Sequence, residues 1–401
     1  MISVEEASAR ILATFTPVGA ETVALAEAAG RISAAPVIAR TTQPPADVSA
    51  MDGFAVRAEE ARGGAALRLI GSAPAGHPFA GSVGAGETVR IFTGSFIPAG
   101  ADAVLLQEDA DAEEGGVRVR ETVRPGQHIR RMGQDFAHGD VVIAAGRRLS
   151  SRDIGLAAAA DHPWLLVHRR PRVAVLATGD EIALPGEPIP PGGIVSSNAH
   201  ALAAMVAALG GAPSVLPIAA DDTEAIGRAA DAARGFDLLL TTGGISVGAH
   251  DLVQEGLARR GLAVDFWKIA MRPGKPLMFG RLGEMPVLGL PGNPVAAFVC
   301  ALLFARPALL RLAGLAAAPL PISRAETATA LGANDRRFAF LRARLEEDAA
   351  GRLVAAAFAI QDSAMQAVLA RADALILRPP HAPAVAAGAA VEIVRFDRLG
   401  L

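Results

Sequence analysis

Residues 237–248 read Asp-Leu-Leu-Leu-Thr-Thr-Gly-Gly-Ile-Ser-Val-Gly, an apolar run that passes directly into a loop rich in glycine and hydroxyl groups. Two other stretches share this plan. Residues 172–181 pass from Arg-Val-Ala-Val-Leu-Ala into Thr-Gly-Asp-Glu, and residues 287–294 pass from Val-Leu-Gly-Leu into Pro-Gly-Asn-Pro. Short apolar runs that end in such turn residues predict buried strands. We therefore expect strands of one sheet, each followed by a loop.

Helical patterns alternate with these strands. Beyond them the sequence predicts helices at 199–209 (with Asn198 as N-cap), up to 234 (with Asp222 as cap), about 250–260 and 295–312, and a strand at 213–220. Strands that alternate with helices favour an open, mostly parallel α/β sheet covered on both faces. Because such sheets bind ligands at the carboxyl ends of their strands, the loops are the candidate ligand site.

The flanking regions contain short apolar runs between glycine and proline turns, which is typical of small β-rich domains. The predicted fold class is therefore α/β plus β, with several domains. The predicted divisions are an N-terminal linker domain (1–41 plus 125–170, with helices at 25–35 and 153–160), a small β-rich domain (42–124), the central α/β domain (171–317) and a C-terminal β-barrel domain (318–401).

Composition excludes several classes of protein. The 401 residues hold 38 Lys and Arg against 41 Asp and Glu, a net charge of −3, which argues against a protein that coats nucleic acid. The single cysteine, Cys300, excludes an intrachain disulfide and cysteine-rich metal sites. The apolar run 295–305 is well short of the roughly 20 residues that span a membrane. The start Met-Ile-Ser-Val-Glu-Glu has no secretory pattern, so we expect a soluble, cytoplasmic protein.

The loops after the predicted strands suit an anion. Glycines and hydroxyl residues let backbone N–H groups approach a phosphate closely. A tight turn would explain any one of these loops, but three at one sheet edge favour a shared anion site. The sequence has neither a Walker A loop nor a G-x-G-x-x-G fingerprint after a strand, so the predicted site is of another kind. Ser246 has no evident His and Asp relay, which argues against a serine hydrolase.

Charged residues accompany the loops. Glu181, Asp221 and Asp251 could hold Mg²⁺, which takes oxygen ligands and often keeps substrate phosphates, although solvated carboxylates or helix caps would explain them too. Lysine is scarce in this chain, yet Lys268 and Lys275 lie close together with Arg272 between them. These cations could neutralise a phosphate or an oxyanion, and the alternative is a solvated loop.

The order and spacing of the motifs resemble the molybdopterin molybdenumtransferases of the MoeA type, which are similar to the E domain of gephyrin. The resemblance covers nearly the whole chain. It rests on the motifs at 49–55 (Ser-Ala-Met-Asp-Gly-Phe-Ala), 91–94 (Ile-Phe-Thr-Gly), 130–135 (Arg-Arg-Met-Gly-Gln-Asp), 178–181, 197–198, 243–251, 272–276 (Arg-Pro-Gly-Lys-Pro) and 289–294.

This resemblance implies four domains and an elongated homodimer, with the active site between the α/β domain of one subunit and the small domain of the other. The implied reaction inserts molybdenum from molybdate into adenylylated molybdopterin and releases AMP, with Mg²⁺ assisting. A molybdopterin adenylyltransferase and acceptor molybdoenzymes are the implied partners. Neither nucleic acid nor a membrane is expected as a partner.

The resemblance and the loop chemistry together assign the site residues. The expected catalytic residues are Asp52, Asp135, Glu181 and Asp251. The expected metal ligands are Glu181, Asp221 and Asp251. The expected substrate-binding residues are Thr93, Thr178, Gly179, Asp221, Gly243, Gly244, Ser246, Lys268, Arg272, Lys275, Pro291, Asn293, Arg342 and Ser363.

Two residues depart from the family pattern. Arg272 stands where lysine is usual, and Val48 stands where asparagine is common. Two alternative functions remain open at this point: the adenylyltransferase of the preceding step, and a scaffold that binds molybdopterin without turnover. The regions outside the α/β domain, with the loop at 49–53, argue against the first. The carboxylate set argues against the second.

Overall fold

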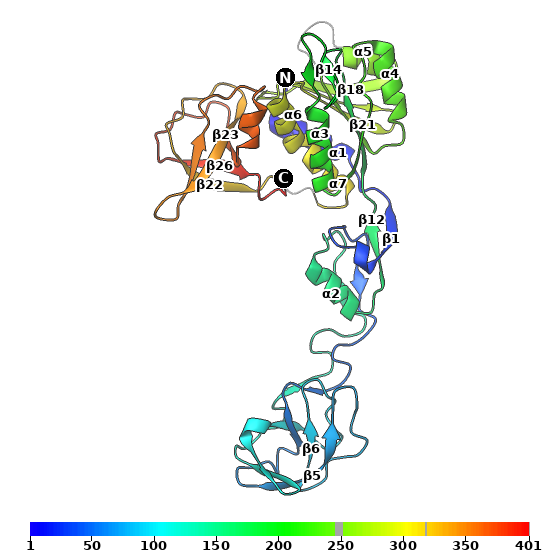
Figure 1. The fold of residues 1–401 in the computed structure, drawn as a ribbon, viewed down its shortest axis with the longest axis vertical. Helices are drawn as coiled ribbons and strands as arrows, with labels where there is room; N and C mark the ends of the chain where they lie inside the picture. Colours follow the sequence, from blue (N-terminus) through cyan, green and yellow to red (C-terminus); the bar gives the residue numbers. More distant parts are fainter. Residues whose placement is uncertain (245–251, 317–318, 401) are drawn as a thin grey trace.

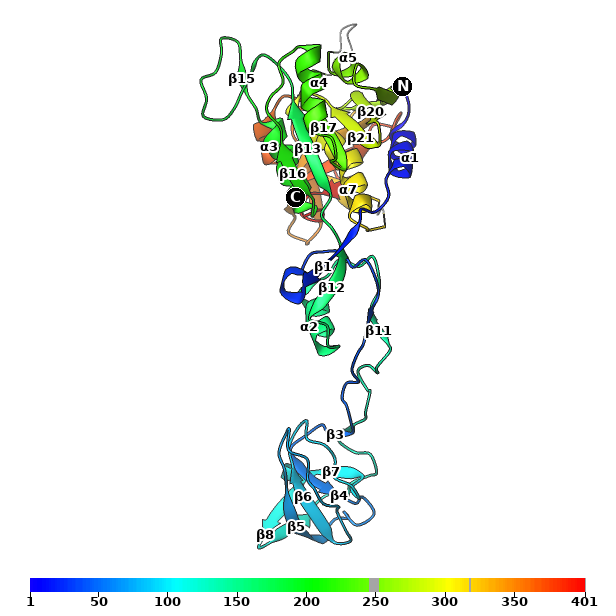
Figure 2. The same ribbon diagram turned by 90° about the vertical axis from the view of Figure 1, so that its right-hand side faces the viewer.

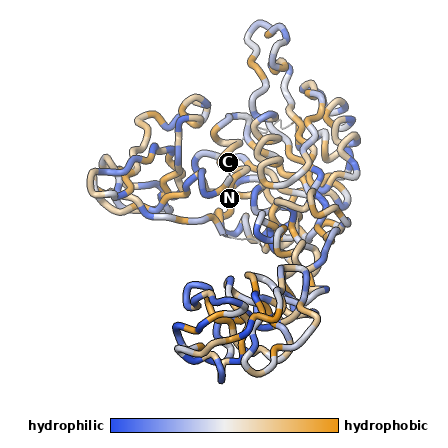
Figure 3. The backbone as a smooth tube through the Cα atoms, turned by 60° about the horizontal axis from the view of Figure 1, so that its bottom comes forward, coloured by the Kyte–Doolittle hydropathy of each residue, from blue (hydrophilic) through white to orange (hydrophobic). Residues whose placement is uncertain are grey.

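The computed structural model describes residues 1–244, 252–316 and 319–400. The chain is elongated, with a six-stranded sheet and its helices at one end and a separate small β domain at the other (Figure 1, Figure 2). Hydrophobic and hydrophilic residues alternate along the backbone in each part (Figure 3), as expected where every part buries a core of its own. The exact domain limits stay a prediction.

The central sheet confirms the predicted strand-and-helix pattern, with one correction. In spatial order its strands are β16 (Ala212–Val215), β13 (Arg172–Ala177), β17 (Leu238–Thr242), β21 (Met285–Leu290), β20 (Pro276–Leu282) and β18 (Leu262–Lys268). The first four run parallel. The sequence analysis did not predict β18 and β20, which run antiparallel to their neighbours and make the sheet mixed.

Helices cover both faces of this sheet, as predicted. Val173 and Val175 point to the face covered by α1 (Val4–Thr14), α3 (Asn198–Ala208), α6 (Pro294–Cys300) and α7 (Arg306–Leu312). Ala174 and Leu176 point to the other face, covered by α4 (Thr223–Ala232) and α5 (Leu252–Ala258). Successive side chains of a strand alternate between faces, so an all-apolar strand requires two covering layers.

The predicted long helix at 295–312 is interrupted. A π-helical segment, Ala301–Ala305, joins α6 to α7. By length and composition the run Pro294–Leu312 could cross a membrane, but 83% of the qualifying window is buried inside the protein. It is the core helix of the α/β domain.

Three other local predictions were wrong in detail. Residues 25–35 form only a 3-10 turn (Leu25–Glu27), because Ile32 and Ser33 pair with residues of other segments instead of continuing a helix. The strand predicted at 213–220 ends at Val215, and Pro217 has no N–H with which to extend the ladder. Helix α2 (Ser151–Ala159) begins two residues earlier than predicted, because Ser150 and Asp153 form a capping box.

The small β domain is a six-stranded sheet, which confirms the predicted β-rich character of this region. In spatial order the strands are β7 (Ala103–Leu106), β4 (Gly53–Val56), β6 (Glu87–Ile91), β5 (Ala66–Ala73), β9 (Gly116–Val119) and β8 (Ala110–Glu113). The region between it and the α/β domain holds α2 and three short antiparallel pairs: β1 (Ala20–Ala24) with β12 (Trp164–His168), β2 (Val37–Ile38) with β11 (Val141–Ile143), and β3 (Val48–Ser49) with β10 (Ile129–Arg130).

The C-terminal part is a closed barrel, as predicted. Its strands are β22 (Ile322–Thr327), β23 (Phe338–Glu347), β24 (Leu353–Ala357), β25 (Ala374–Arg378) and β26 (Ala390–Arg395), and pairing of β23 with β25 closes the ring. Strand β19 (Met271–Arg272) of the α/β part pairs with β23. The barrel is therefore joined to the α/β domain through backbone hydrogen bonds. A short helix, α8 (Gln366–Ala370), lies between β24 and β25.

Candidate functional site

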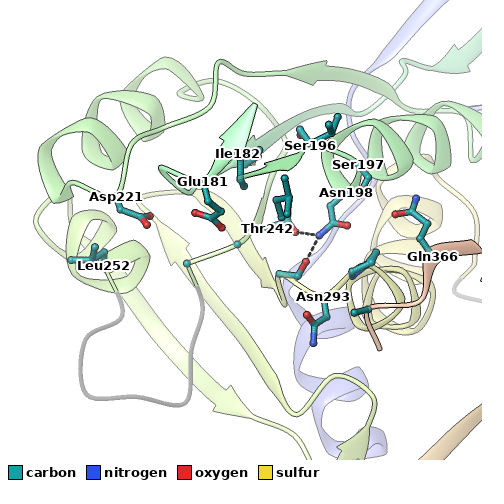
Figure 4. A pocket seen from close by; sticks show the side chains of 18 residues that line it. Glu181, Ile182, Ser196, Ser197, Asn198, Asp221, Thr242, Leu252, Asn293 and Gln366 are labelled. Carbon is teal, nitrogen blue, oxygen red and sulfur yellow. Dashed lines mark hydrogen bonds between the residues drawn. The ribbon is translucent and has the colours of Figure 1, made fainter. Parts of the chain in front are cut away.

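A pocket of about 650 Å³ lies at the carboxyl ends of β13, β17 and β21, where the sequence predicted it (Figure 4). The three parallel strands are neighbours, so their loops meet at one edge of the sheet. The lining residues are Ala177, Glu181, Ile182, Ile194, Val195, Ser196, Ser197, Asn198, Asp221, Thr242, Gly243, Gly244, Leu252, Gly292, Asn293, Pro294, Ala364 and Gln366.

Gly243 and Gly244 cannot be replaced by larger residues without strain. Both have positive φ, +90° and +64°. A Cβ on Gly243 would lie 2.4 Å from the carbonyl oxygen of Thr178, and one on Gly244 would lie 2.4 Å from Cγ2 of Val253. Glycine therefore lets the loop after β17 fold tightly against the loop after β13, which exposes backbone groups to the pocket.

Beside this pair, Oγ1 of Thr178 is buried and has no hydrogen-bond partner among the described residues. Gly179 is also in a conformation that favours glycine, with φ +147°. An unpaired hydroxyl next to a glycine loop is a group that a ligand could satisfy.

Asn198 connects the strand-end loops. Its Nδ2 donates to Oγ1 of Thr242 at 2.9 Å and to the carbonyl oxygen of Gly292 at 2.7 Å. The Thr242 hydroxyl donates in turn to the carbonyl oxygen of Pro291 at 3.1 Å. The predicted N-cap role of Asn198 was wrong: it is the first residue of α3, and Ser197 occupies the cap position. The sequence analysis quoted Asn198 in a motif but assigned it no site role.

Carboxylates form the acidic side of the pocket. Glu181 and Asp221 both line it (Figure 4). The Asp221 N–H donates to Oδ1 of Asp180 at 3.0 Å. Burial raises the pKa of Asp221, and the negative charges of Asp180 and Glu181 raise it further. A cation would relieve this repulsion.

The predicted residues Asp251 and Ser246 lie outside the described residues. Within the described ranges, no group of three His, Cys, Asp or Glu side chains is arranged to hold a metal ion. Mg²⁺ commonly binds through one or two carboxylates plus substrate phosphates, so a pair such as Glu181 and Asp221 fits it.

The predicted cations reach the same edge of the sheet through the two antiparallel strands. Because β20 runs opposite to β21, its start beside Lys275 lies next to the end of β21, and Lys268 ends β18 at that edge. None of the three cations lines the pocket. Arg272 instead faces the barrel, where Nη2 lies 3.4 Å from Oδ1 of Asn334 and Nη1 lies 3.9 Å from Asp335.

The barrel supplies a further side of the pocket. Nδ2 of Asn293 donates to Oγ of Ser363 at 2.8 Å, and the Val295 N–H donates to the carbonyl oxygen of Ser363 at 3.0 Å. Ala364 in the same loop and Gln366 at the start of α8, which the sequence analysis missed, also line the pocket. No local pattern marks them, because they reach the site only through the docking of the barrel.

Arg342 is buried, with 1% of its surface exposed. Its guanidinium donates to the carbonyl oxygens of Asp362 at 2.9 Å, Met365 at 3.2 Å and Ile360 at 3.4 Å. Burial lowers the pKa of Arg342. Its side chain therefore holds the loop that carries Ser363, and a direct contact with substrate stays a prediction.

Asp52 and Thr93 form a pair on the small domain. Oδ1 of Asp52 accepts from the Thr93 N–H at 2.7 Å and from the Thr93 hydroxyl at 2.8 Å, and these hydrogen bonds lower the pKa of Asp52. Asp135 is exposed, and its N–H donates to the carbonyl oxygen of Gln43 at 3.0 Å. The small domain lies at the far end of the molecule from the α/β domain (Figure 1). Within one chain, Asp52 therefore lies far from the pocket.

Family models match three parts of the chain that together span most of its length. Residues 2–160 match the family model of the MoeA N-terminal region (domain I and II), residues 174–311 that of a probable molybdopterin binding domain, and residues 324–396 that of the MoeA C-terminal region (domain IV).

Curated proteins and a solved structure agree with these matches. The chain is 38% identical to the molybdopterin molybdenumtransferase of Nostoc sp. over 305 residues, which cover 74% of this chain and 70% of that protein. It is 36% identical to molybdopterin molybdenumtransferase 2 of Mycobacterium tuberculosis over 383 residues, or 93% and 94% of the two chains. The crystal structure of a molybdopterin biosynthesis MoeA protein from Pyrococcus horikosii superimposes with a TM-score of 0.87 at 29% identity, covering 99% of each chain. This chain belongs to the MoeA family.

Proposed function

We propose that this chain inserts molybdenum from molybdate into adenylylated molybdopterin and releases AMP, with Mg²⁺ assisting, as one step of molybdenum cofactor biosynthesis. The observation that carries the proposal is the pocket at the sheet edge, which joins glycine-rich strand-end loops to the carboxylates of Glu181 and Asp221. The similarity of the chain to proteins named molybdopterin molybdenumtransferase supports it.

In this proposal the chain's own residues bind and orient the substrate. Backbone N–H groups around Gly243 and Gly244 hold a phosphate of the substrate. The Thr178 hydroxyl, which has no hydrogen-bond partner in the part of the chain that the structure describes, forms a hydrogen bond with the substrate. Glu181 and Asp221 hold Mg²⁺, with Asp251 as a further ligand. Bound Mg²⁺ would polarise the phosphoanhydride bond whose cleavage releases AMP.

Molybdate is an oxyanion and needs cations near the reacting end of the substrate. Lys268, Arg272 and Lys275 supply three positive charges at the sheet edge, in the part of the molecule where β19 meets the barrel. Arg272 keeps the charge of the usual lysine. Its planar guanidinium already contacts Asn334, so it is less free than a lysine to follow the oxyanion.

We propose that the active unit is a homodimer in which the partner's small domain covers the pocket. The distance between the small domain and the pocket within one chain supports this arrangement (Figure 1). Chains carrying Asp52→Asn and chains carrying Glu181→Gln should each keep only a small, measurable residual activity alone. Mixed dimers should recover activity, because each keeps one site with both residues intact. Mixed dimers that stay inactive would contradict the shared site.

The proposal extends to the setting of the reaction. A molybdopterin adenylyltransferase would supply the substrate, and acceptor molybdoenzymes would take the product. The location is proposed to be the cytoplasm. Neither nucleic acid nor a membrane enters the reaction.

The deciding experiment measures AMP release by the purified chain from adenylylated molybdopterin and Mg²⁺, with and without molybdate. AMP release that requires molybdate and leaves molybdenum bound to the pterin supports the transferase. Tight binding without AMP release would make the chain a scaffold. Formation of adenylylated molybdopterin from ATP and molybdopterin would make it the adenylyltransferase. The Glu181→Gln variant is the matched control for background hydrolysis.

A further inference from the structure

On the small domain, the Arg90 guanidinium contacts two aromatic rings. Its Cζ is 4.9 Å from the ring centroid of Phe54 and 5.3 Å from that of Phe92. The antiparallel register of β4 and β6 places Phe54 directly opposite Arg90. Phe92 lies two residues further along the chain, on the same face. A guanidinium held over two rings restricts both of them.

Each of these two rings belongs to a residue close to Asp52 or Thr93 in the sequence. Phe54 lies two residues after Asp52, and Phe92 immediately precedes Thr93. The arginine therefore contacts both backbone segments that must keep their spacing for Oδ1 of Asp52 to accept two hydrogen bonds from Thr93.

A third segment is tied to the same group. Nη2 of Arg90 donates to Oε1 of Gln107 at 2.6 Å, and the Gln107 N–H donates to the Asp52 carbonyl oxygen at 3.3 Å. Gln107 follows β7, the other neighbour of β4. One guanidinium thus connects the segments that end at Asp52, at Thr93 and at Gln107.

We infer that Arg90 is a positioning residue that fixes the Asp52 carboxylate for the reaction, by holding Phe54, Phe92 and Gln107 together. This inference rests on the proposed function of Asp52. Lysine would not replace arginine here. A guanidinium is planar, so it can stack on aromatic rings while an N–H group in its plane donates to Gln107, whereas a compact ammonium cannot do both. The positive charge also acts on Asp52: after the hydrogen bonds from Thr93, the charge of Arg90 helps to lower the pKa of that carboxyl.

The test compares Arg90→Ala and Arg90→Lys with Arg68→Ala, the matched control. Arg68 lies on β5 of the same sheet, pairs with Glu87 and does not contact the Asp52 segment. Both Arg90 variants should lower kcat for molybdenum insertion by about tenfold or more, since small displacements of a reacting group cost this much. Arg68→Ala should behave as the wild type. Thermal unfolding of each variant shows whether the small domain still folds.

Two readouts separate positioning from a general structural effect. The ¹³Cγ titration midpoint of Asp52 should rise in Arg90→Ala and remain unchanged in Arg68→Ala. In a double-mutant cycle, adding Arg90→Ala to Asp52→Asn should cause no further loss of activity, because the arginine acts through Asp52. Losses that multiply would overturn the inference, as would a folded Arg90→Ala variant with wild-type kcat. Full activity of Asp52→Asn alone would instead refute the proposed role of Asp52.

Discussion

Nδ2 of Asn198 donates a 2.9 Å hydrogen bond to Oγ1 of Thr242, which joins the first turn of α3 to the end of β17. The same nitrogen reaches the carbonyl oxygen of Gly292. A single amide therefore sets the distance between two of the loops that form the pocket. Thr242 is also held in the sheet by pairing with Ala177 and Leu290, whereas Gly292 lies beyond the end of β21. The amide of Asn198 is therefore most important for holding the loop that contains Gly292.

Replacing Asn198 by aspartate should disrupt the pocket, although the two side chains have nearly the same size. The isosteric carboxylate loses both donated hydrogen bonds and places negative charge against the Gly292 carbonyl oxygen. We expect a loss of about 1–3 kcal/mol in unfolding free energy and weaker binding of adenylylated molybdopterin, measured by chemical denaturation and calorimetry. His200→Ala, at an exposed position of the same helix, should change neither. Unchanged ligand affinity in Asn198→Asp would show that the link does not shape the site.

Removing one charge from the carboxylate pair should stabilise the ligand-free protein. Burial raises the pKa of Asp221 most, and repulsion by the negative charges of Asp180 and Glu181 raises it further. Glu181→Gln should therefore increase the unfolding free energy by about 0.5 kcal/mol without Mg²⁺. It should also abolish any stabilisation by added Mg²⁺, followed by thermal unfolding.

Glu187→Gln is the matched control for this pair. Glu187 is an exposed carboxylate between β14 (Ile182–Ala183) and β15 (Ile194–Val195) that does not line the pocket. It should leave the Mg²⁺ response intact. A Glu181→Gln protein that still gains stability from Mg²⁺ to the wild-type extent would exclude Glu181 as a ligand.

Truncating Arg342 should damage the barrel and the site together. Arg342→Ala leaves the carbonyl oxygens of Asp362, Met365 and Ile360 without their donor in a buried setting. The expected cost is about 3 kcal/mol in unfolding free energy, and Ser363 should lose its fixed position against Asn293. Arg344→Ala, two residues along the same strand and exposed, should cost little. Equal stability of the two variants would contradict the anchoring role.

The Asp52 and Thr93 contact should depend on pH in a defined direction. The folded pKa of Asp52 is below its ordinary value of 3.8, so the contact contributes stability above pH 3.8 and loses it as the pH falls through the lower, folded pKa. Thr93→Val keeps the backbone donor and removes the hydroxyl. The midpoint of the Asp52 ¹³Cγ titration should then move up toward 3.8, whereas Thr93→Ser should keep it low. No movement in Thr93→Val would assign the whole effect to the backbone N–H.

Much of the α/β domain follows from local patterns in the sequence. Apolar runs that end in glycine loops predicted β13, β17 and β21, and the carboxylate of Asp222 caps α4 as expected. The loop motifs also carried the resemblance to the MoeA family. Such features depend on residues within a few positions of one another, and so a single sequence displays them.

The pairing of distant segments was decided only in the tertiary structure. Strands β18 and β20 bring Lys268 and Lys275 to the carboxyl edge of the sheet, because β20 pairs antiparallel with β21 and β18 pairs antiparallel with β20. The burial of Arg342 depends on the carbonyl groups of a loop folded around it. Residues 25–35 favoured a helix in isolation but formed bridges with Arg148 and Val167. Strand partners and burial are set by contacts between residues far apart in the chain. The free energy of those contacts exceeds the small free-energy differences that make up helix and strand propensity.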